Sequence, residues 1–288
     1  MALKLPNLWR SVDRCEGNYT HLSVQYVPVK FLSQFKKYLR RLTQLKLVTQ
    51  CKTILTGEFI PNFPDFGYYN PSINQWSFAW NKWLEGLRRK PAKTIEDPAS
   101  YAVSVDKKDL LIIKELQKNA RRSFADLAPI LGISLQGVKY HFDKKLIPSG
   151  IVKYYNFDVW PYPEEISACH ELLLEFPNKH AMNRFYSLVG ELFFVLGVAK
   201  VLRQNQLLVS TYTPQTQVPS LFAFLSQMAS HGFLDTYSSV RQSFINREAQ
   251  PVSYELFEDG VGWTFDLRKR LSELSKLARA TTMREKAR

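Results

Sequence analysis

Three polar side chains recur at helical spacing in the middle of the chain. Gln136, Lys139 and Tyr140 are three and four residues apart within 135–145, whereas Val138 and Phe142 fall on another side of the same helix. A carboxamide, an ammonium and a phenol can hydrogen-bond to base edges in a major groove, and a glutamine amide favours adenine by its geometry. We therefore expect these three side chains to contact DNA bases.

A second set of side chains has the chemistry to bind phosphate. Basic groups and hydroxyls at the ends of helices neutralise or hydrogen-bond the DNA backbone, which positions a protein without reading sequence. The candidates are Arg121, Arg122, Ser134, Lys144, Lys145 and Lys153. The alternative is a three-helix protein-interaction module whose charged face is merely solvated.

Three short helices would position these groups. Asp106 and Ser123 are expected N-caps of the first and second helices, and Ser134 is the expected N-cap of the third helix, over 135–145. Gly132 supplies a tight turn between the second and third helices because glycine tolerates positive φ. Residues 151–155 then have the character of a wing strand. This order predicts a winged helix-turn-helix.

The same residues carry a family resemblance. The run Val-Asp-x-x-Asp-x-x-Ile-x-x-x-Leu-Gln-x-x-Ala-Arg covers 105–121, and Ser-Phe-Ala-Asp-Leu-Ala-x-x-Leu-Gly-Ile-Ser covers 123–134. Both resemble the leucine-responsive/asparagine regulator (Lrp/AsnC) family of transcription regulators, in particular its archaeal members. The resemblance extends over about 104–245 and implies DNA as a partner. It also implies homodimers or larger assemblies through the sheet domain, and control by a small-molecule effector.

The sequence departs from that family in three places. The third helix is one residue longer before Gly150 than the family spacing, and the DNA-binding unit is internal rather than N-terminal. Residues 198–202 and the turn 203–205 lack the family's glycine-rich ligand loop. No residues are therefore assigned to an effector.

The remainder of the chain predicts an α+β protein. Alternation of strand and helix patterns over 169–244 follows the order β-α-β-β-α-β, which is ferredoxin-like. A basic helix is expected at the C-terminal end. The expected domains are an N-terminal module over 1–97, the helix-turn-helix over 98–160, an effector or oligomerisation domain over 161–260 and a basic helix over 261–288.

The N-terminal module looks like a partial repeat of the ferredoxin-like domain. A hairpin is expected over 8–28, a helix over 31–45, a strand over 48–55 and a helix over 76–87, with a linker over 88–100. Several of these patterns recur 186 to 189 residues later, although two unrelated modules could show the same by chance. The module lacks a first strand and helix, either through partial duplication or through loss of an upstream piece. Its open sheet edge should pack on the C-terminal module or on a second chain.

Charge and composition narrow the class of function. The formal net charge is +13, which favours a polyanionic partner. The aromatic residues of 63–83 could stack on bases, but we favour a role in packing. Three scattered cysteines predict neither a disulfide framework nor a metal site, and no apolar run is long enough to cross a membrane. A cytoplasmic protein without a cofactor is expected.

The sequence is also compatible with two other functions. One is an architectural DNA-binding protein of low specificity. The other is an enzyme similar to the haem-biosynthesis decarboxylases, which share both fold elements; it would need a site for tetrapyrrole carboxylates. The local candidates for that site are His170, His180, Arg184 and Arg203. Residues 161–260 include 6 basic and 10 acidic residues, and this excess of negative charge disfavours a pocket for carboxylates.

Overall fold

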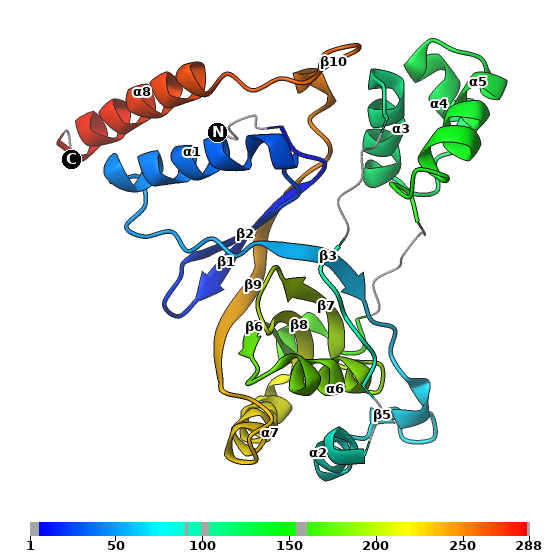
Figure 1. Cartoon of the computed structure of the whole chain (residues 1–288), viewed down its shortest axis with the longest axis vertical. Helices are drawn as coiled ribbons and strands as arrows, with labels where there is room; N and C mark the ends of the chain where they lie inside the picture. The colour runs from blue at the N-terminus through cyan, green and yellow to red at the C-terminus, as the bar shows by residue number, and fades with distance from the viewer. Residues whose placement is uncertain (1–5, 90–91, 99–103, 154–159, 287–288) are drawn as a thin grey trace.

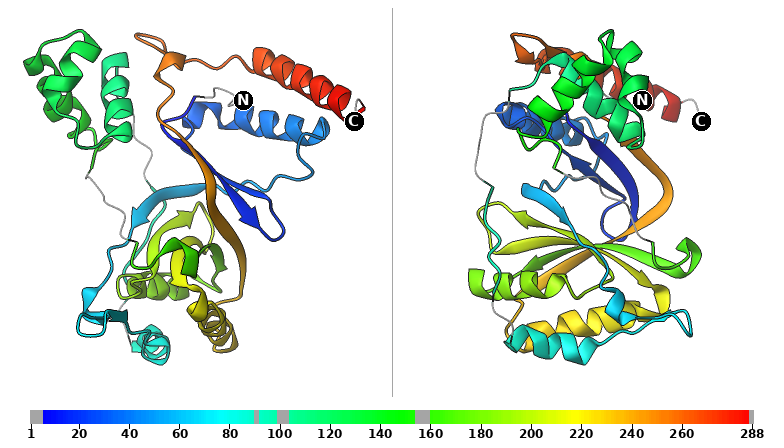
Figure 2. Two further views of the ribbon diagram at one scale, coloured as in Figure 1. Left: turned by 180° about the vertical axis from the view of Figure 1, so that it is seen from behind. Right: turned by 90° about the vertical axis from the view of Figure 1, so that its right-hand side faces the viewer.

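The computed structural model describes residues 6–89, 92–98, 104–153 and 160–286 (Figure 1). A twisted sheet runs through the middle of the molecule. At one of its ends lie the helices of the chain's centre together with the first and last helices, and at the other end lie the helices that cover the main core (Figures 1 and 2).

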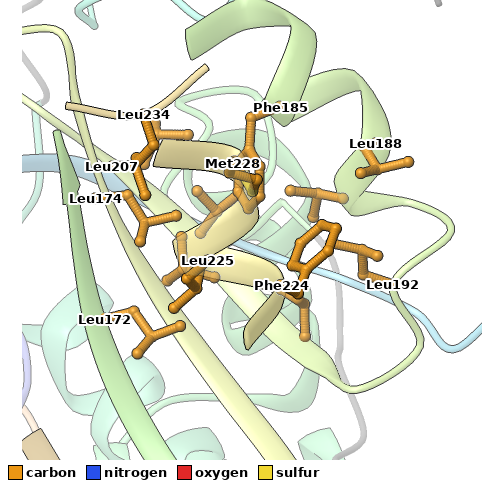
Figure 3. Packing of buried hydrophobic residues seen from close by; sticks show 14 of the residues in the cluster. Leu172, Leu174, Phe185, Leu188, Leu192, Leu207, Phe224, Leu225, Met228 and Leu234 are labelled. Carbon is orange, nitrogen blue, oxygen red and sulfur yellow. The ribbon is translucent and has the colours of Figure 1, made fainter. Parts of the chain in front are cut away.

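The C-terminal part of the sheet has the predicted ferredoxin-like topology. Its elements are β6 (Ser167–Glu175), α6 (Lys179–Val189), β7 (Val195–Val201), β8 (Gln206–Pro214), α7 (Val218–Ser230) and β9 (Thr236–Gln250). The four strands pair antiparallel in the order β9-β6-β8-β7. Alternate residues of these strands, such as Leu172 and Leu207, pack against Phe224 and Met228 of α7 (Figure 3). This apolar layer forms the main core.

The N-terminal segment extends the same sheet at both edges. Its elements are β1 (Arg10–Glu16), β2 (His21–Gln25), α1 (Leu32–Gln44), β3 (Thr56–Pro61), the two-residue strands β4 (Tyr69–Asn70) and β5 (Gln75–Trp76), and α2 (Trp80–Arg89). β1 pairs with β9, and β3 pairs with β7, so the full order is β2-β1-β9-β6-β8-β7-β3. Of the two expected coverings for the N-terminal module, the structure shows the C-terminal module of the same chain.

The strand predicted over 48–55 is wrong. No regular element covers these residues, Lys46 has a φ of 55°, and Val48 is 37% exposed. The strand begins at Thr56 because that is where the chain reaches β7, with Thr56 opposite Val201. The β-forming side chains before it have no neighbouring strand with which to pair.

The prediction of a linker over 88–100 is also wrong for the residues of this range that the structure describes. Helix α2 continues to Arg89, and residues 92–98 then lie along α6 and the end of β7. Ile95 is 5% exposed, and its amide donates to the side chain of Asn183 at 3.2 Å. Asp97 accepts a hydrogen bond from Lys200 at 2.5 Å. This segment is therefore docked along its length rather than solvated.

The aromatic residues near α2 are mainly a packing surface, as we favoured. Trp83 is fully buried, and Trp76 stacks on Phe193 with ring centroids 4.5 Å apart. Phe78 lies 5.0 Å from the same Phe193 ring. These contacts hold α2 and the β4–β5 hairpin against the C-terminal core. Phe63 and Phe66 are exceptions, because they are 52% and 62% exposed.

The remaining elements follow the predicted order. The central helices are α3 (Lys107–Lys118), α4 (Phe124–Leu131) and α5 (Leu135–His141), and a π-helical turn over Phe142–Leu146 continues α5. The C-terminal end comprises β10 (Phe257–Glu258), β11 (Gly262–Trp263) and α8 (Leu267–Lys286). Helix α8 packs along α1 through Leu274, Phe35 and Tyr38.

One buried histidine makes stability depend on pH. His170 of β6 is 5% exposed and packs edge-on against Phe222. Burial, with a smaller contribution from Arg241, lowers its pKa from 6.5 to about 4, and Glu16 opposes the shift. Below pH 6.5 the unfolded chain takes up a proton that the folded chain resists, so the free energy of unfolding falls as pH drops from 6.5 to about 4.

We expect urea denaturation to show this loss, on the order of 2 kcal/mol over that interval. Replacing His170 by Leu removes the titrating group and should flatten the dependence. Replacing the exposed His231 by Gln is the matched control and should leave it intact. Equal pH profiles for the parent and His170→Leu would show that His170 is not responsible.

Candidate nucleic-acid interface

Local hydrogen bonds position the three central helices. Asp106 forms a capping box with Asp109 at the start of α3, and Ser123 forms another with Asp126 at the start of α4. The Ser134 hydroxyl accepts the amide of Gly137 at 3.1 Å and so caps α5. All three predicted N-caps are confirmed. Such side chains satisfy amides that the first turn of a helix leaves without partners.

The turn between α4 and α5 depends on a glycine. Gly132 has φ of +64° and lies in the left-handed region, where a side chain is disfavoured. Its amide and that of Ile133 close the end of α4 on the carbonyls of Pro129 and Ala128. Helix α5 can therefore start at Leu135, shortly after α4 ends at Leu131, as in a helix-turn-helix.

Helix α5 presents the three predicted base-contacting residues on one exposed face. Gln136, Lys139 and Tyr140 are exposed, with Tyr140 at 59%. Val138, between them in sequence, is fully buried in the core of the three helices. The anchoring of Val138 fixes which side of α5 faces outward.

Helix α5 continues into the π-helical turn over Phe142–Leu146. The amide of Ile147 bonds to the carbonyl of Phe142 at 3.0 Å, which is a separation of five residues rather than four. The helix therefore widens locally at this turn without being interrupted. It follows directly after the exposed face formed by Gln136, Lys139 and Tyr140.

A buried carboxylate joins α3 to α5 behind this face. Asp109 is fully buried, its Oδ1 lies 2.6 Å from Nδ1 of His141, and its Oδ2 lies 3.4 Å from Nζ of Lys145. The same ammonium lies 2.5 Å from Oδ2 of Asp106. Asp106, Asp109 and His141 have metal-ligating chemistry. An ammonium, however, already contacts both carboxylates.

Asp106 and Lys145 stabilise each other's charged forms. Burial raises the pKa of Asp106, but the hydrogen bonds from Lys145 and from the amide of Asp109 outweigh it, so the net pKa is lowered. Burial likewise lowers the pKa of Lys145, and its bond with Asp106 more than reverses this. Both groups are therefore charged at neutral pH. The cluster acts as a brace between the helices.

The predicted phosphate contacts divide into two groups. Lys145 is bound to Asp106, Arg122 to Glu115, and Lys153 to Glu58 at 2.5 Å, so each is engaged by a carboxylate. Arg121 and Lys144 are exposed, and neither forms an ion pair within the described part of the chain. Ser134 serves as a cap and is exposed. Arg121, Lys144 and Ser134 are thus the more accessible candidates.

The helix-turn-helix is docked on the C-terminal end of the sheet. Gln117 of α3 donates to the carbonyl of Leu8 at 3.0 Å and accepts the amide of Val252 at 2.9 Å. Nζ of Lys114 lies 4.1 Å from the centre of the Tyr254 ring. Sequence reasoning missed these residues because their partners are more than 100 positions away. No local pattern marks such contacts.

Part of the predicted wing lies outside the described residues. Positions 154 and 155 belong to that part, and the described residues 151–153 form no strand. The contact between Lys153 and Glu58 belongs to the loop that leads into this region.

The four residues considered for an enzyme's substrate site do not come together in one place. His170 is buried against Phe222 on β6, whereas His180 is exposed on α6. Arg184 lies further along α6, and Arg203 lies in the turn between β7 and β8, where its amide donates to Asp97 at 3.1 Å. Their side chains come from different surfaces of the module.

Comparison with known proteins identifies the class. Residues 105–153 match the family described as winged helix-turn-helix DNA-binding. This match confirms the predicted helix-turn-helix. The chain therefore contains a winged helix-turn-helix domain of the DNA-binding type.

Solved structures of regulators resemble about half of the chain. A transcriptional regulator from Neisseria meningitidis, in complex with L-Met, is 20% identical with a TM-score of 0.41, over 50% of this chain and 93% of that one. An AsnC-family regulatory protein from Pyrococcus furiosus is 19% identical with a TM-score of 0.36, over 48% and 89%. E. coli AsnC is 14% identical with a TM-score of 0.36, over 50% and 94%.

Two further comparisons are negative. No curated protein matches the sequence. Within the described residues, no helix combines the length and apolar character that crossing a membrane requires.

Proposed function

We propose that the chain is a sequence-specific DNA-binding transcription regulator. The observation that carries the proposal is the exposed face of α5, where Gln136, Lys139 and Tyr140 lie together on a helix whose inner side is anchored by Val138. A helix of this kind inserts into a major groove, about 12 Å wide, and reads base edges through its exposed polar side chains. Arg121, Lys144 and Ser134 would position it on the phosphates.

Support comes from the rigidity of the helix-turn-helix. Its caps, the Asp109 brace and the docking through Gln117 orient α5 relative to the sheet. Base readout requires such a fixed orientation, because a displacement of about 1 Å already weakens directional hydrogen bonds. A purely electrostatic DNA-coating protein would not need it.

The test is fluorescence anisotropy with duplex DNA from the chain's own promoter and with a scrambled duplex of equal length, over a range of salt concentrations. We expect tighter binding to the promoter at every salt concentration, typically by 10³-fold or more for specific regulators. Equal binding to both duplexes would favour the architectural, low-specificity alternative. Absence of binding to either duplex would refute the proposal.

No enzymatic activity is proposed. The His and Arg candidates are spread over β6, α6 and a turn, and His170 is buried in the sheet with its ring edge-on to Phe222. A polar substrate site needs several such groups converging on one cavity.

A further inference from the structure

The described elements follow one order twice. The N-terminal segment runs β1, β2, α1, β3, a hairpin of two-residue strands, and α2. The C-terminal segment runs β7, β8, α7, β9, a second hairpin of two-residue strands, and α8. In both segments a single 3-10 turn precedes the first helix and another precedes the small hairpin.

The strand registers repeat as well. Arg14 pairs with His21 as Lys200 pairs with Leu207, an offset of 186 at both positions. Between the segments, Val12 lies opposite Glu248, and Val198 lies opposite Ile60. Val198 therefore stands 186 positions after Val12, and Glu248 stands 188 positions after Ile60. The neighbouring pairs Ser11–Ala249 and Gly197–Pro61 are related by the same two offsets.

Each segment therefore gives its third strand to the other. β9 pairs with β6 of its own unit and, along its other edge from Arg241 to Gln250, with β1 of the N-terminal segment, and β3 pairs with β7 of the C-terminal segment. The helices follow the same exchange: α8 packs on Phe35 and Tyr38 of α1, while α2 packs in the core that holds Phe224 of α7. Reciprocal contacts of this kind are the signature of a two-fold, isologous interface.

We infer that the N-terminal and C-terminal segments of one chain together form an intramolecular pseudo-dimer, and that the protein binds DNA as a monomer. The N-terminal segment occupies the place against the C-terminal sheet that a second subunit of a two-fold assembly would take. Among the described residues, only the C-terminal unit carries a helix-turn-helix. This inference rests on the proposed function and adds that the site read on DNA is asymmetric, with one recognition helix per assembly.

The two small hairpins pack on different parts of the molecule. Phe257 and Trp263 of the β10–β11 hairpin pack against the core of α3–α5. In the other hairpin, Trp76 instead stacks on Phe193 in the main core. The β4–β5 hairpin, which corresponds to the hairpin that contacts the helix-turn-helix, therefore packs on the main core instead.

The test combines solution mass with DNA stoichiometry. Light scattering should give about one chain, 33.5 kDa, for the free protein. The promoter element that the protein protects from nuclease is then placed in duplexes either as one copy or as two copies in an inverted repeat, and the number of chains bound to each duplex is measured. We expect one chain per element and equal affinity for each copy. A mass of two chains, or cooperative binding that requires the inverted repeat, would overturn the inference. If no duplex is bound, the proposed function fails, and the mass alone still decides whether the chain is its own partner.

A separate observation concerns charge. Between Gly17 and Gly57 the sequence contains seven basic residues and no acidic residue. Lys36, Lys37 and Arg40 of α1 are exposed and form no ion pair within the described part of the chain. Lys36 and Arg40 line a hollow of about 320 Å³ together with Thr43. Helix α1 lies at the same end of the molecule as the helix-turn-helix (Figure 1).

We propose that this face of α1 binds DNA phosphates beside the sequence read by α5. Several basic side chains in the helix-turn-helix, such as Lys145 and Arg122, are engaged by carboxylates, whereas those of α1 are available to release counterions from a duplex. The contact would strengthen binding without selecting sequence.

The test is the salt dependence of binding for Lys36→Gln/Lys37→Gln/Arg40→Gln. Each lost phosphate contact should reduce the slope of log K against log salt by about 0.9, so the triple variant should lose roughly 2 to 3. The ratio of promoter to scrambled binding should stay unchanged. The matched control, Arg88→Gln/Arg89→Gln, removes charges from α2 at the opposite end (Figure 1) and should not change the slope. An unchanged slope in the triple variant, with either duplex, would overturn this proposal while leaving the role of α5 intact.

Discussion

Replacing both Lys139 and Tyr140 by Ala is expected to abolish the preference for promoter DNA. Both side chains are exposed on α5, so their removal costs contacts with bases rather than packing. A good base contact contributes about 1–3 kcal/mol of discrimination. The double variant should therefore bind the promoter at least about 30-fold more weakly and approach the affinity measured with scrambled DNA. Fluorescence anisotropy with both duplexes measures this change.

Two controls separate readout from folding. Exposed substitutions usually alter stability by less than about 0.5 kcal/mol, so the double variant should unfold in urea like the parent. Lys82→Ala removes an exposed charge from α2, at the other end of the molecule (Figure 1), and should retain the promoter preference. A double variant that folds and still prefers its promoter would show that α5 is not the reading helix.

Replacing Asp109 by Ala is expected to be the most destabilising change in the helix-turn-helix. The carboxylate is fully buried and bridges His141 and Lys145, so its loss leaves two polar groups without this partner. Breaking a buried pair on one side typically costs about 3–5 kcal/mol. We expect a loss of roughly 3 kcal/mol in urea denaturation, since Asp106 still pairs with Lys145. DNA binding should weaken as well, because the brace sets the position of α5 relative to α3.

Asp143→Ala provides the matched comparison. Asp143 is an exposed carboxylate next to α5 with no ion pair within the described residues. Its removal should leave the unfolding free energy nearly unchanged, and the lost negative charge should, if anything, strengthen DNA binding. Equal stabilities for the Asp109 and Asp143 variants would contradict the bracing role of Asp109.

Local interactions explain why the helix-turn-helix could be predicted well. Asp106, Ser123 and Ser134 bond to amides two or three residues ahead, and Gly132 adopts its positive φ within a single turn. Such preferences act over a few residues and leave a direct trace in the sequence. The exposed face of α5 follows from helical periodicity once Val138 is placed inside.

The incorrect predictions involve long-range contacts. The apolar run before Thr56 has strand-like composition, but strand formation depends on a neighbour, and β7 is reached only at Thr56. Lys145 looks like a phosphate contact in sequence, and only the approach of Asp106, 39 positions earlier, shows that its ammonium is engaged. The segment around Ile95 resembles a linker until Asn183 is seen to bond its amide.

The sequence by itself determined the three helices with their caps, the glycine turn, the β-α-β-β-α-β order and the excess of positive charge. Each of these depends on side-chain types and on periodicities of two to four residues. Only the tertiary structure decided that β1 pairs with β9 and β3 with β7, and that α3 docks beside Val252. Sheet pairing satisfies backbone groups that are the same in every residue, so partners more than 100 positions apart are selected only by the packing of the whole chain.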